Sequence, residues 1–127
     1  MSLGRIKPKR VGGFPRPERP PEERIKDFNE IFIPYTEEQA IEEAKRCLLC
    51  PMPQCVKACP VKTDVPGMIE YIQKGDFEKA IEMLRDTNCL PGTTGTVCPQ
   101  LGKLCEANCV VGKVGEPVAI GLLQRFL

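Results

Sequence analysis

Apolar residues recur at helical spacing in the middle of the chain, and each run follows a helix-start signal. Thr36 and Gln39 have the spacing of a capping box, which predicts that a helix begins there. The apolar positions that follow are Ala40, Ile41, Ala44 and Leu48. Pro51 and Pro53 then prevent this helix from continuing. A weaker helical pattern precedes it between Pro21 and Phe32.

Two further runs predict a helical hairpin. Asp64 can cap its first helix, with Pro66 in the first turn and Gly75 as the stop. Asp76 can cap the second helix. The apolar positions are Ile69 and Ile72 in the first helix and Phe77, Ala80, Ile81 and Leu84 in the second. This spacing is typical of amphipathic helices that pack together, so the hairpin is expected to be structural and to bring the segments on either side of it together.

The last third of the chain predicts less regular structure. The segment from Asn88 to Gly95 is rich in Gly, Thr and Pro, so an irregular loop is expected. A short helix from about Lys103 would place Cys105 and Cys109 on one face. Pro117 is expected to open a final helix, whose apolar residues are Val118, Ala119, Ile120, Leu122, Leu123 and Phe126. Because this helix has no capping residues at its end, the sequence is expected to be cut from a longer flavoprotein.

Composition narrows the possible functions. A chain of 127 residues makes one or two small domains. It has no histidine, which removes the commonest general base and every mixed Cys-His metal site, so hydrolytic chemistry is not expected. The net charge of +1 gives no strong field for nucleic acid or an anionic membrane. Without a signal peptide or a spanning apolar run, a soluble protein in the reducing cytoplasm is expected.

Residues 1–22 differ from the rest because they are basic and rich in proline. The basic residues are Arg5, Lys7, Lys9, Arg10, Arg16 and Arg19. We expect an extended leader that lies on a neighbouring domain or stays mobile, rather than an arm that binds an acidic partner. Residues 23–127 are expected to form one domain.

Cysteine supplies the candidate chemistry. Seven of the eight cysteines form two blocks, Cys47-x2-Cys50-x4-Cys55-x3-Cys59-Pro60 and Cys98-Pro99-x5-Cys105-x3-Cys109. Thiolates hold the iron corners of an iron–sulfur cluster, and short spacers let the backbone wrap the inorganic core. Bacterial ferredoxins use spacers of two, two and three residues before a Cys-Pro, and their fourth cysteine binds the other cluster. By this rule Cys59 is expected to serve a second cluster, although the middle spacer here is four.

Three other uses of the cysteines are less consistent with the sequence. A disulfide framework suits secreted domains, and no signal peptide opens this chain. Structural zinc accepts four thiolates, but its Cys-x2-Cys pairs usually lie a dozen or more residues apart. A dithiol redox pair at Cys47 and Cys50 needs a strand-helix context that this segment lacks. Cys89 stands apart from both blocks and is predicted to be a buried small residue rather than a ligand.

Several motifs occur in the order of one known domain. They are Glu43-Ala-Lys-Arg-Cys47-Leu-Leu-Cys50, Pro53-x-Cys55-x3-Cys59-Pro60, Val97-Cys98-Pro99, Cys105-Glu106-x2-Cys109 and Pro117-Val-Ala-Ile-Gly121. From about Glu23 to Leu127 the chain resembles the N-terminal iron–sulfur domain of NADPH-dependent glutamate synthase small subunits. The same domain precedes the flavin domains of dihydropyrimidine dehydrogenase and of related electron-bifurcating ferredoxin:NADP oxidoreductases.

The resemblance implies an all-α, ferredoxin-like bundle of short helices around two [4Fe-4S] clusters. It implies that the first cluster is held by Cys47, Cys50, Cys55 and Cys109. It implies that the second is held by Cys59, Cys98, Cys105 and Gln124, which leaves Cys89 free. The implied role is a one-electron relay to a second redox partner, such as the large glutamate synthase subunit. FAD and NADPH are expected on a following domain or a partner, because this chain has no Gly-x-Gly-x-x-Gly motif.

Two positions depart from the glutamate synthase pattern, which more often has Glu at Gln124 and Arg at Thr96. A neutral amide in place of a thiolate removes negative charge, so a higher potential is expected for the second cluster. The basic residues near the cysteines are expected on a solvated face; they are Lys45, Arg46, Lys57 and Lys103. Two other classes of function stay open, a zinc-stapled interaction module and a redox sensor that loses its cluster under oxidants.

Overall fold

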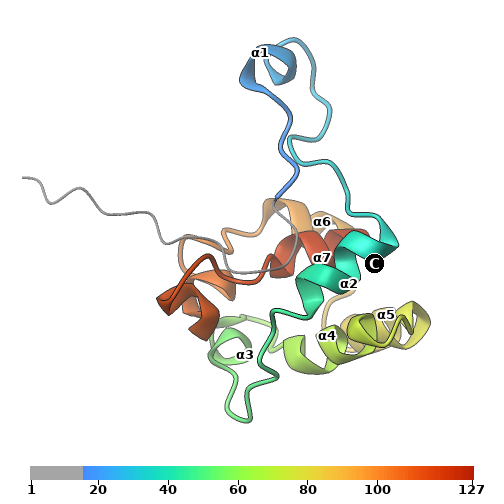
Figure 1. Ribbon diagram of the computed structural model, residues 1–127, viewed down its shortest axis with the longest axis vertical. Helices are drawn as coiled ribbons and strands as arrows, with labels where there is room; N and C mark the ends of the chain where they lie inside the picture. The colour runs from blue at the N-terminus through green and yellow to red at the C-terminus, as the bar shows by residue number, and fades with distance from the viewer. Residues whose placement is uncertain (1–15) are drawn as a thin grey trace, which may run out of the picture.

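The computed structural model describes residues 16–127, which form short helices (Figure 1). Residues 1–15, most of the predicted leader, lie outside the described residues. The α-helices are α1 (Pro21–Arg24), α2 (Glu37–Ala44), α3 (Gln54–Ala58), α4 (Val65–Gln73), α5 (Phe77–Arg85), α6 (Pro91–Val97) and α7 (Ile120–Phe126), and two 3₁₀ helices are η1 (Glu106–Asn108) and η2 (Val110–Lys113). Within residues 16–127 the only β pairing is an isolated bridge between Glu18 and Phe32. The predicted all-α class is confirmed.

Helix α2 begins with the predicted capping box. The Thr36 side chain accepts a hydrogen bond from the Gln39 backbone N–H, and the Gln39 side chain accepts one from the Thr36 N–H. The helix ends at Ala44, earlier than its apolar pattern suggested, and Leu48 lies beyond it with 68% of its surface exposed. The weaker pattern of residues 21–32 forms only the single turn of α1.

The predicted hairpin of α4 and α5 is confirmed. Asp64 accepts a hydrogen bond from the Gly67 N–H at 3.1 Å, and Asp76 accepts one from the Lys79 N–H at 3.3 Å. Gly75 has φ +75°, a left-handed conformation that glycine adopts without strain, and it ends α4. The two helices lie side by side (Figure 1). Their buried residues form much of the core; they are Val65, Met68, Ile69, Ile72, Ala80 and Leu84.

Helix α6 corrects the predicted loop at 88–95. Gly, Thr and Pro are weak helix formers, but close packing against α7 stabilises this helix. A Cβ atom on Gly95 would lie 2.7 Å from the carbonyl oxygen of Gly121, so only glycine allows this approach. Helix α7 begins at Ile120, three residues after Pro117, which corrects the predicted start of the last helix.

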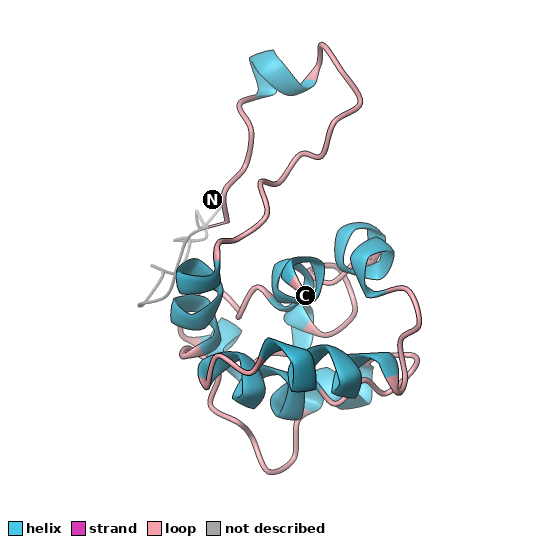
Figure 2. Ribbon diagram, turned by 90° about the vertical axis from the view of Figure 1, so that its right-hand side faces the viewer, coloured by secondary structure: helices cyan, strands magenta, loops and turns pink. Residues whose placement is uncertain are grey.

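Residues 16–34 form an arm that projects from the helical body (Figures 1 and 2). Its two sides are joined by backbone hydrogen bonds from the Arg19 N–H to the Ile31 oxygen and from the Ile33 N–H to the Pro17 oxygen. Arg125 of α7 contacts the arm through an ion pair with Glu30 at 2.6 Å. Within residues 16–127, no helix is long and apolar enough to cross a membrane.

Candidate metal centre

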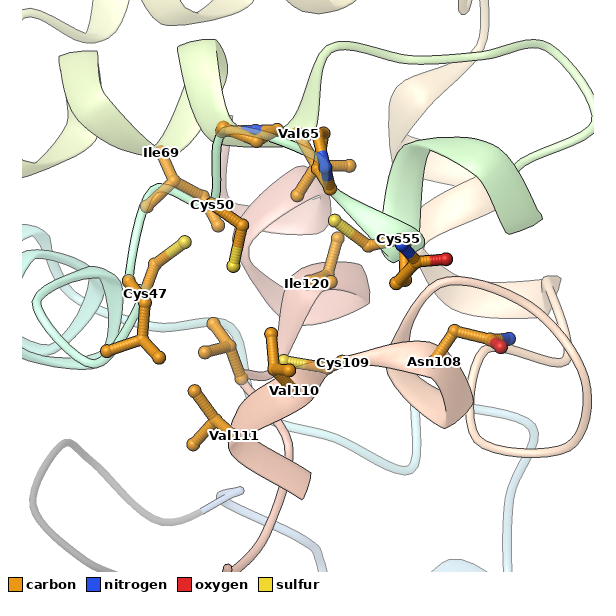
Figure 3. Close-up of a pocket in the computed structure, with 15 residues that line it drawn as sticks. Cys47, Cys50, Cys55, Val65, Ile69, Asn108, Cys109, Val110, Val111 and Ile120 are labelled. Atoms are coloured by element: carbon orange, nitrogen blue, oxygen red, sulfur yellow. The ribbon is translucent and has the colours of Figure 1, made fainter. Parts of the chain in front are cut away.

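Four of the predicted ligands line a first hollow: Cys47, Cys50, Cys55 and Cys109. Their sulfur atoms face a common space (Figure 3). Cys47 and Cys50 lie on the turn after α2, where Leu49 adopts φ +47° and Pro51 prevents another helical turn. Cys55 lies in α3, and Cys109 lies between η1 and η2. The hollow therefore joins three segments of the chain.

The walls of the first hollow are mostly aliphatic. They include Val65, Ile69, Val111, Val118 and Ile120. Burial raises the pKa of the Cys47 thiol and raises that of Cys55 to about 11, and the neighbouring sulfurs add to both shifts. Thiolates are therefore costly here without a compensating cation, and bound iron would supply that positive charge.

The other four predicted ligands line a second hollow: Cys59, Cys98, Cys105 and Gln124. Cys59 directly follows α3, and Cys98 directly follows α6. Cys105 precedes η1, and Gln124 lies in α7. Gln124 is only 8% exposed. The walls here are more polar and include Thr63, Asn88, Thr94 and Gln100. The close approach of Gly95 and Gly121 holds α6 beside α7, so it sets the position of Cys98 relative to Gln124.

The thiols of the second hollow differ in their environments. Burial raises the pKa of Cys105 to about 12, and the adjacent Glu106 carboxylate adds to the shift. Burial also raises the pKa of Cys98. Cys59 has a lowered pKa, because hydrogen bonds from Thr63 and from the backbone N–H groups of Val61 and Lys62 outweigh the effect of its burial. Cys59 is thus the thiol best prepared to ionise.

Each of three chain segments contributes one residue to each hollow, and the two residues lie four positions apart. Cys55 lines the first hollow and Cys59 the second. In the next segment the order is reversed, since Cys105 lines the second hollow and Cys109 the first. In α7, Ile120 lines the first hollow and Gln124 the second. The two hollows are therefore built together from the same pieces of chain.

The predicted helix with Cys105 and Cys109 on one face is wrong. The short 3₁₀ helix η1 lies between them, and each cysteine lines a different hollow. The Ala107 N–H bonds the distant Gln100 oxygen, and the Asn108 side-chain amide donates to the Leu104 and Lys103 carbonyls. These carbonyls are thus satisfied by a side chain instead of by a helical ladder.

The ligand atoms do not converge on one point. Among residues 16–127, no three Cys, Asp or Glu side chains are placed to hold a single metal ion. A zinc ion needs all of its sulfurs about 2.3 Å from one centre. In a [4Fe-4S] cluster each ligand binds a different iron, so the ligands stand further apart around a shared core. The donors therefore fit a cluster better than a zinc ion.

Cys89 lies apart from both hollows. It was predicted to be buried, but it is exposed, in the turn between α5 and α6. The reason is that α5 ends at Arg85, so the following turn carries Cys89 to the surface. All eight cysteines fall within the described residues, and none of them forms a disulfide.

Sequence reasoning missed two buried glutamates that hold the start of α7, which has no side-chain cap of its own. Glu43 accepts a hydrogen bond from the Ala119 N–H at 2.9 Å, and Glu106 accepts one from the Gly121 N–H at the same distance. Both side chains are fully buried. Their signal in the sequence is only that each lies beside a cysteine block, within the quoted motifs.

Each buried glutamate has an arginine partner. Arg46 donates to Glu43 at 2.7 Å and also bonds the carbonyls of Glu116 and Pro117. Arg46 is therefore buried, which corrects its predicted place on a solvated face. Arg16, from the predicted leader, donates to Glu106 at 2.6 Å. These bonds tie α7 to α2 on one side and to η1 on the other.

Comparisons with known proteins identify the family of this chain. The sequence profile of the family described as dihydropyrimidine dehydrogenase domain II, 4Fe-4S cluster, matches residues 24–127. The chain belongs to this family. The match includes both hollows and all eight predicted ligands, and it makes this chain an iron–sulfur domain of the oxidoreductase type.

Three relatives illustrate the range of proteins that contain this family's domain. The glutamate synthase [NADPH] small chain of Azospirillum brasilense is 37% identical over 87% of this chain and 23% of its own length. The putative oxidoreductase AegA of Escherichia coli is 38% identical over 84% of this chain and 16% of its own. The NAD-dependent dihydropyrimidine dehydrogenase subunit PreT of Escherichia coli is 40% identical over 79% of this chain and 24% of its own length. The chain thus spans about a quarter or less of these relatives.

Proposed function

We propose that this chain is an electron-transfer domain that carries two [4Fe-4S] clusters, one in each hollow. Its proposed setting is the small subunit of an NADPH-dependent glutamate synthase. The observation that carries the proposal is the division of the eight candidate ligands into two groups of four, each lining its own hollow. Family membership supports the type of cofactor.

The two ligand sets differ by one residue type. In this proposal the first cluster is bound by Cys47, Cys50, Cys55 and Cys109. The second is bound by Cys59, Cys98, Cys105 and Gln124. A bound [4Fe-4S] cluster takes up and releases one electron at a time, and its potential depends on charge, hydrogen bonds and exposure.

The chain's own residues hold the ligands and control their surroundings. The aliphatic walls of the first hollow, including Ile69 and Val118, keep water away from the sulfurs. Glu43 and Glu106 fix the start of α7 and so position Gln124. The basic side chains of the cluster-bearing segments, such as Lys57 and Lys103, are exposed and are proposed to help docking rather than chemistry.

The proposed partners lie outside this chain. FAD and NADPH would bind to a following domain or to another subunit, because the chain has no dinucleotide-binding glycine motif. The acceptor would be the large glutamate synthase subunit, in the reducing cytoplasm where cysteines stay reduced. Similarity to PreT supports an alternative, in which the same relay serves a dihydropyrimidine dehydrogenase.

Metal and sulfide analysis tests this proposal. The chain is prepared and reconstituted without oxygen, iron, sulfide and zinc are measured, and an EPR spectrum is recorded after reduction. About eight irons and eight sulfides per chain are expected. Zinc without sulfide would overturn the proposal, and about four irons would contradict the second site. Cys89→Ser is the matched control, since Cys89 lines neither hollow, and it should retain the full content.

A further inference from the structure

The second hollow has a hydroxyl group beside one of its sulfurs. Thr63 is 1% exposed, and its Oγ1 lies 3.7 Å from Cys59 Sγ, within the range of hydrogen bonds to sulfur. The backbone turn that places it there includes Lys62, which has φ +57° and donates its N–H to the Cys59 oxygen. The backbone carbonyl oxygen of Thr63 accepts a hydrogen bond from the Val65 N–H at 2.8 Å, as α4 begins. The hydroxyl is therefore held in place by the local fold.

A second threonine stands behind the first. Thr87, after α5, donates its hydroxyl to Thr63 Oγ1 at 3.2 Å. A hydroxyl group has one proton and two lone pairs, so Thr63 can accept from Thr87 and still donate its own proton. A thiolate has no proton, so an ionised Cys59 can only accept. In this arrangement Thr87 donates a hydrogen bond to Thr63, and Thr63 donates one to Cys59.

We propose that Thr63 tunes the cluster of the second hollow by donating a hydrogen bond to Cys59 Sγ, with Thr87 reinforcing it. This inference rests on the proposed function, because it requires a cluster bound to Cys59. A hydrogen bond to a ligand sulfur stabilises the reduced, more negative state more than the oxidised state, and so raises the reduction potential. Thr63 acts through Cys59, so it is a positioning residue rather than a ligand.

The arrangement is specific to this sulfur. Of the described residues that line the first hollow, none carries a hydroxyl group. In the second hollow, the hydroxyl of Thr94 already donates to the Leu90 carbonyl at 3.1 Å and accepts from Asn88 at 2.6 Å. Among the described residues that line the two hollows, Thr63 thus has the one hydroxyl group positioned to donate to a ligand sulfur; the other donors to Cys59 are backbone N–H groups.

Redox titration of Thr63→Val tests the inference. Valine keeps the shape of threonine without its hydroxyl, and Thr87 is exposed, so its freed hydroxyl can bond water. One hydrogen bond to a charged sulfur predicts a reduction equilibrium constant about three- to tenfold lower, or about 30 to 60 mV for a one-electron step. Thr63→Ser should restore the wild-type potential, and Thr87→Val should shift it in the same direction by less.

Two readouts separate tuning from a structural role. The reduction potential of only one of the two clusters should shift in Thr63→Val. It should be the same cluster whose potential shifts in Gln124→Cys. Pulsed EPR of the reduced protein in deuterated solvent should show one exchangeable proton coupling fewer in Thr63→Val than in wild type. Thr96→Val is the matched control, because Thr96 is exposed on α6 and its hydroxyl donates to the Gly92 carbonyl of its own helix.

The possible failures can be told apart. Wild type with about eight irons upholds the proposed function independently of this test. A Thr63→Val protein with the same iron content and unchanged potential and proton couplings would overturn the inference alone. If Thr63→Val fails to bind the second cluster, Thr63→Ala and Thr87→Val decide between the same two outcomes. A wild-type chain without a second cluster would overturn both proposals.

Discussion

The two hollows share their chain segments but not their surroundings. The first is walled by valine, isoleucine and proline side chains, and burial raises the pKa values of its half-buried Cys47 and Cys55 thiols. The second is walled by threonine, asparagine and glutamine, and its Cys59 thiol has a lowered pKa, although burial raises the pKa values of Cys98 and Cys105. Because the same three chain segments contribute to both hollows, the difference comes from the residues of their walls and not from the path of the backbone. We therefore expect the second site to have the higher potential.

Removing one ligand from each hollow should give the largest effect. Cys55→Ala and Cys98→Ala should each lower the iron content from about eight to about four per chain, because three donors hold a cluster poorly. The remaining EPR signal should differ between the two variants, one for each site. Loss of all iron in both variants would show that the hollows do not load separately. Iron analysis and reduced-state EPR check this prediction.

Removing a buried carboxylate should give the next largest effect. Glu43→Ala removes the carboxylate that accepts from the buried Arg46 and from the Ala119 N–H, and the loss of one partner of a buried ion pair costs about 3–5 kcal/mol of unfolding free energy. Glu106→Ala should cost less, since its partner Arg16 is 20% exposed and can reach water. Urea unfolding measures both. Glu42→Ala, which removes only an exposed pair with Lys45, is the control and should change stability by less than about 1 kcal/mol. Equal losses in all three variants would contradict the burial argument.

Changing the amide donor of the second hollow should shift one potential. Gln124→Cys adds a negative ligand, so the second site should become harder to reduce, by about tenfold or about 60 mV for one electron. The reduction potential of the first cluster should shift far less. Redox titration followed by EPR checks this, with Gln54→Cys as a control, because Gln54 is exposed at the rim of the first hollow. An upward shift in Gln124→Cys would contradict the charge argument.

Loosening the arm should have the smallest effect and should spare both hollows. Glu30→Gln removes the ion pair with Arg125, which is partly exposed, so stability should change by less than about 0.5 kcal/mol. The Arg125 hydrogen bond lowers the pKa of Glu30 in the folded state. The contact is therefore complete above the ordinary Glu value of about 4.3 and is lost as the pH falls through the lowered pKa.

Hydrogen exchange reads out this arm directly. The Ile33 N–H, which bonds the Pro17 oxygen, should exchange faster in Glu30→Gln than in wild type at neutral pH, and in wild type its protection factor, taken relative to the intrinsic exchange rate at the same pH, should fall at low pH. The amide of Ile72, in the buried hairpin, is the internal reference, and its protection factor should not change. Unchanged exchange at Ile33 would show that Arg125 does not hold the arm.

Local signals predicted the regular parts of this fold. The caps at Thr36, Asp64 and Asp76 and the stop at Gly75 depend on neighbouring residues, so the sequence was enough to find them. Helix α6 depends on packing against α7 through glycines, which its own composition does not reveal.

The candidate site was predictable to a different extent. Cysteine spacing indicated iron–sulfur chemistry, and the resemblance supplied the division into two sets, which remains a prediction about ligands. The buried glutamates were missed because Glu43 in a helix and Glu106 beside Cys105 look like ordinary solvated acids. Their role depends on Ala119 and Gly121, which lie 76 and 15 residues away in the chain.

The crossing of segments between the hollows has a consequence for how the domain is made on the ribosome. The first hollow needs Cys109, which emerges 62 residues after Cys47, and the second needs Gln124 in α7. At about 5–20 residues per second, the first thiols wait about 3–12 seconds for their last partner. Until those partners have emerged neither site can close, so the nascent chain presents an incomplete set of thiols. Delivery of iron and sulfide to the proposed sites is then best timed to the emergence of helix α7.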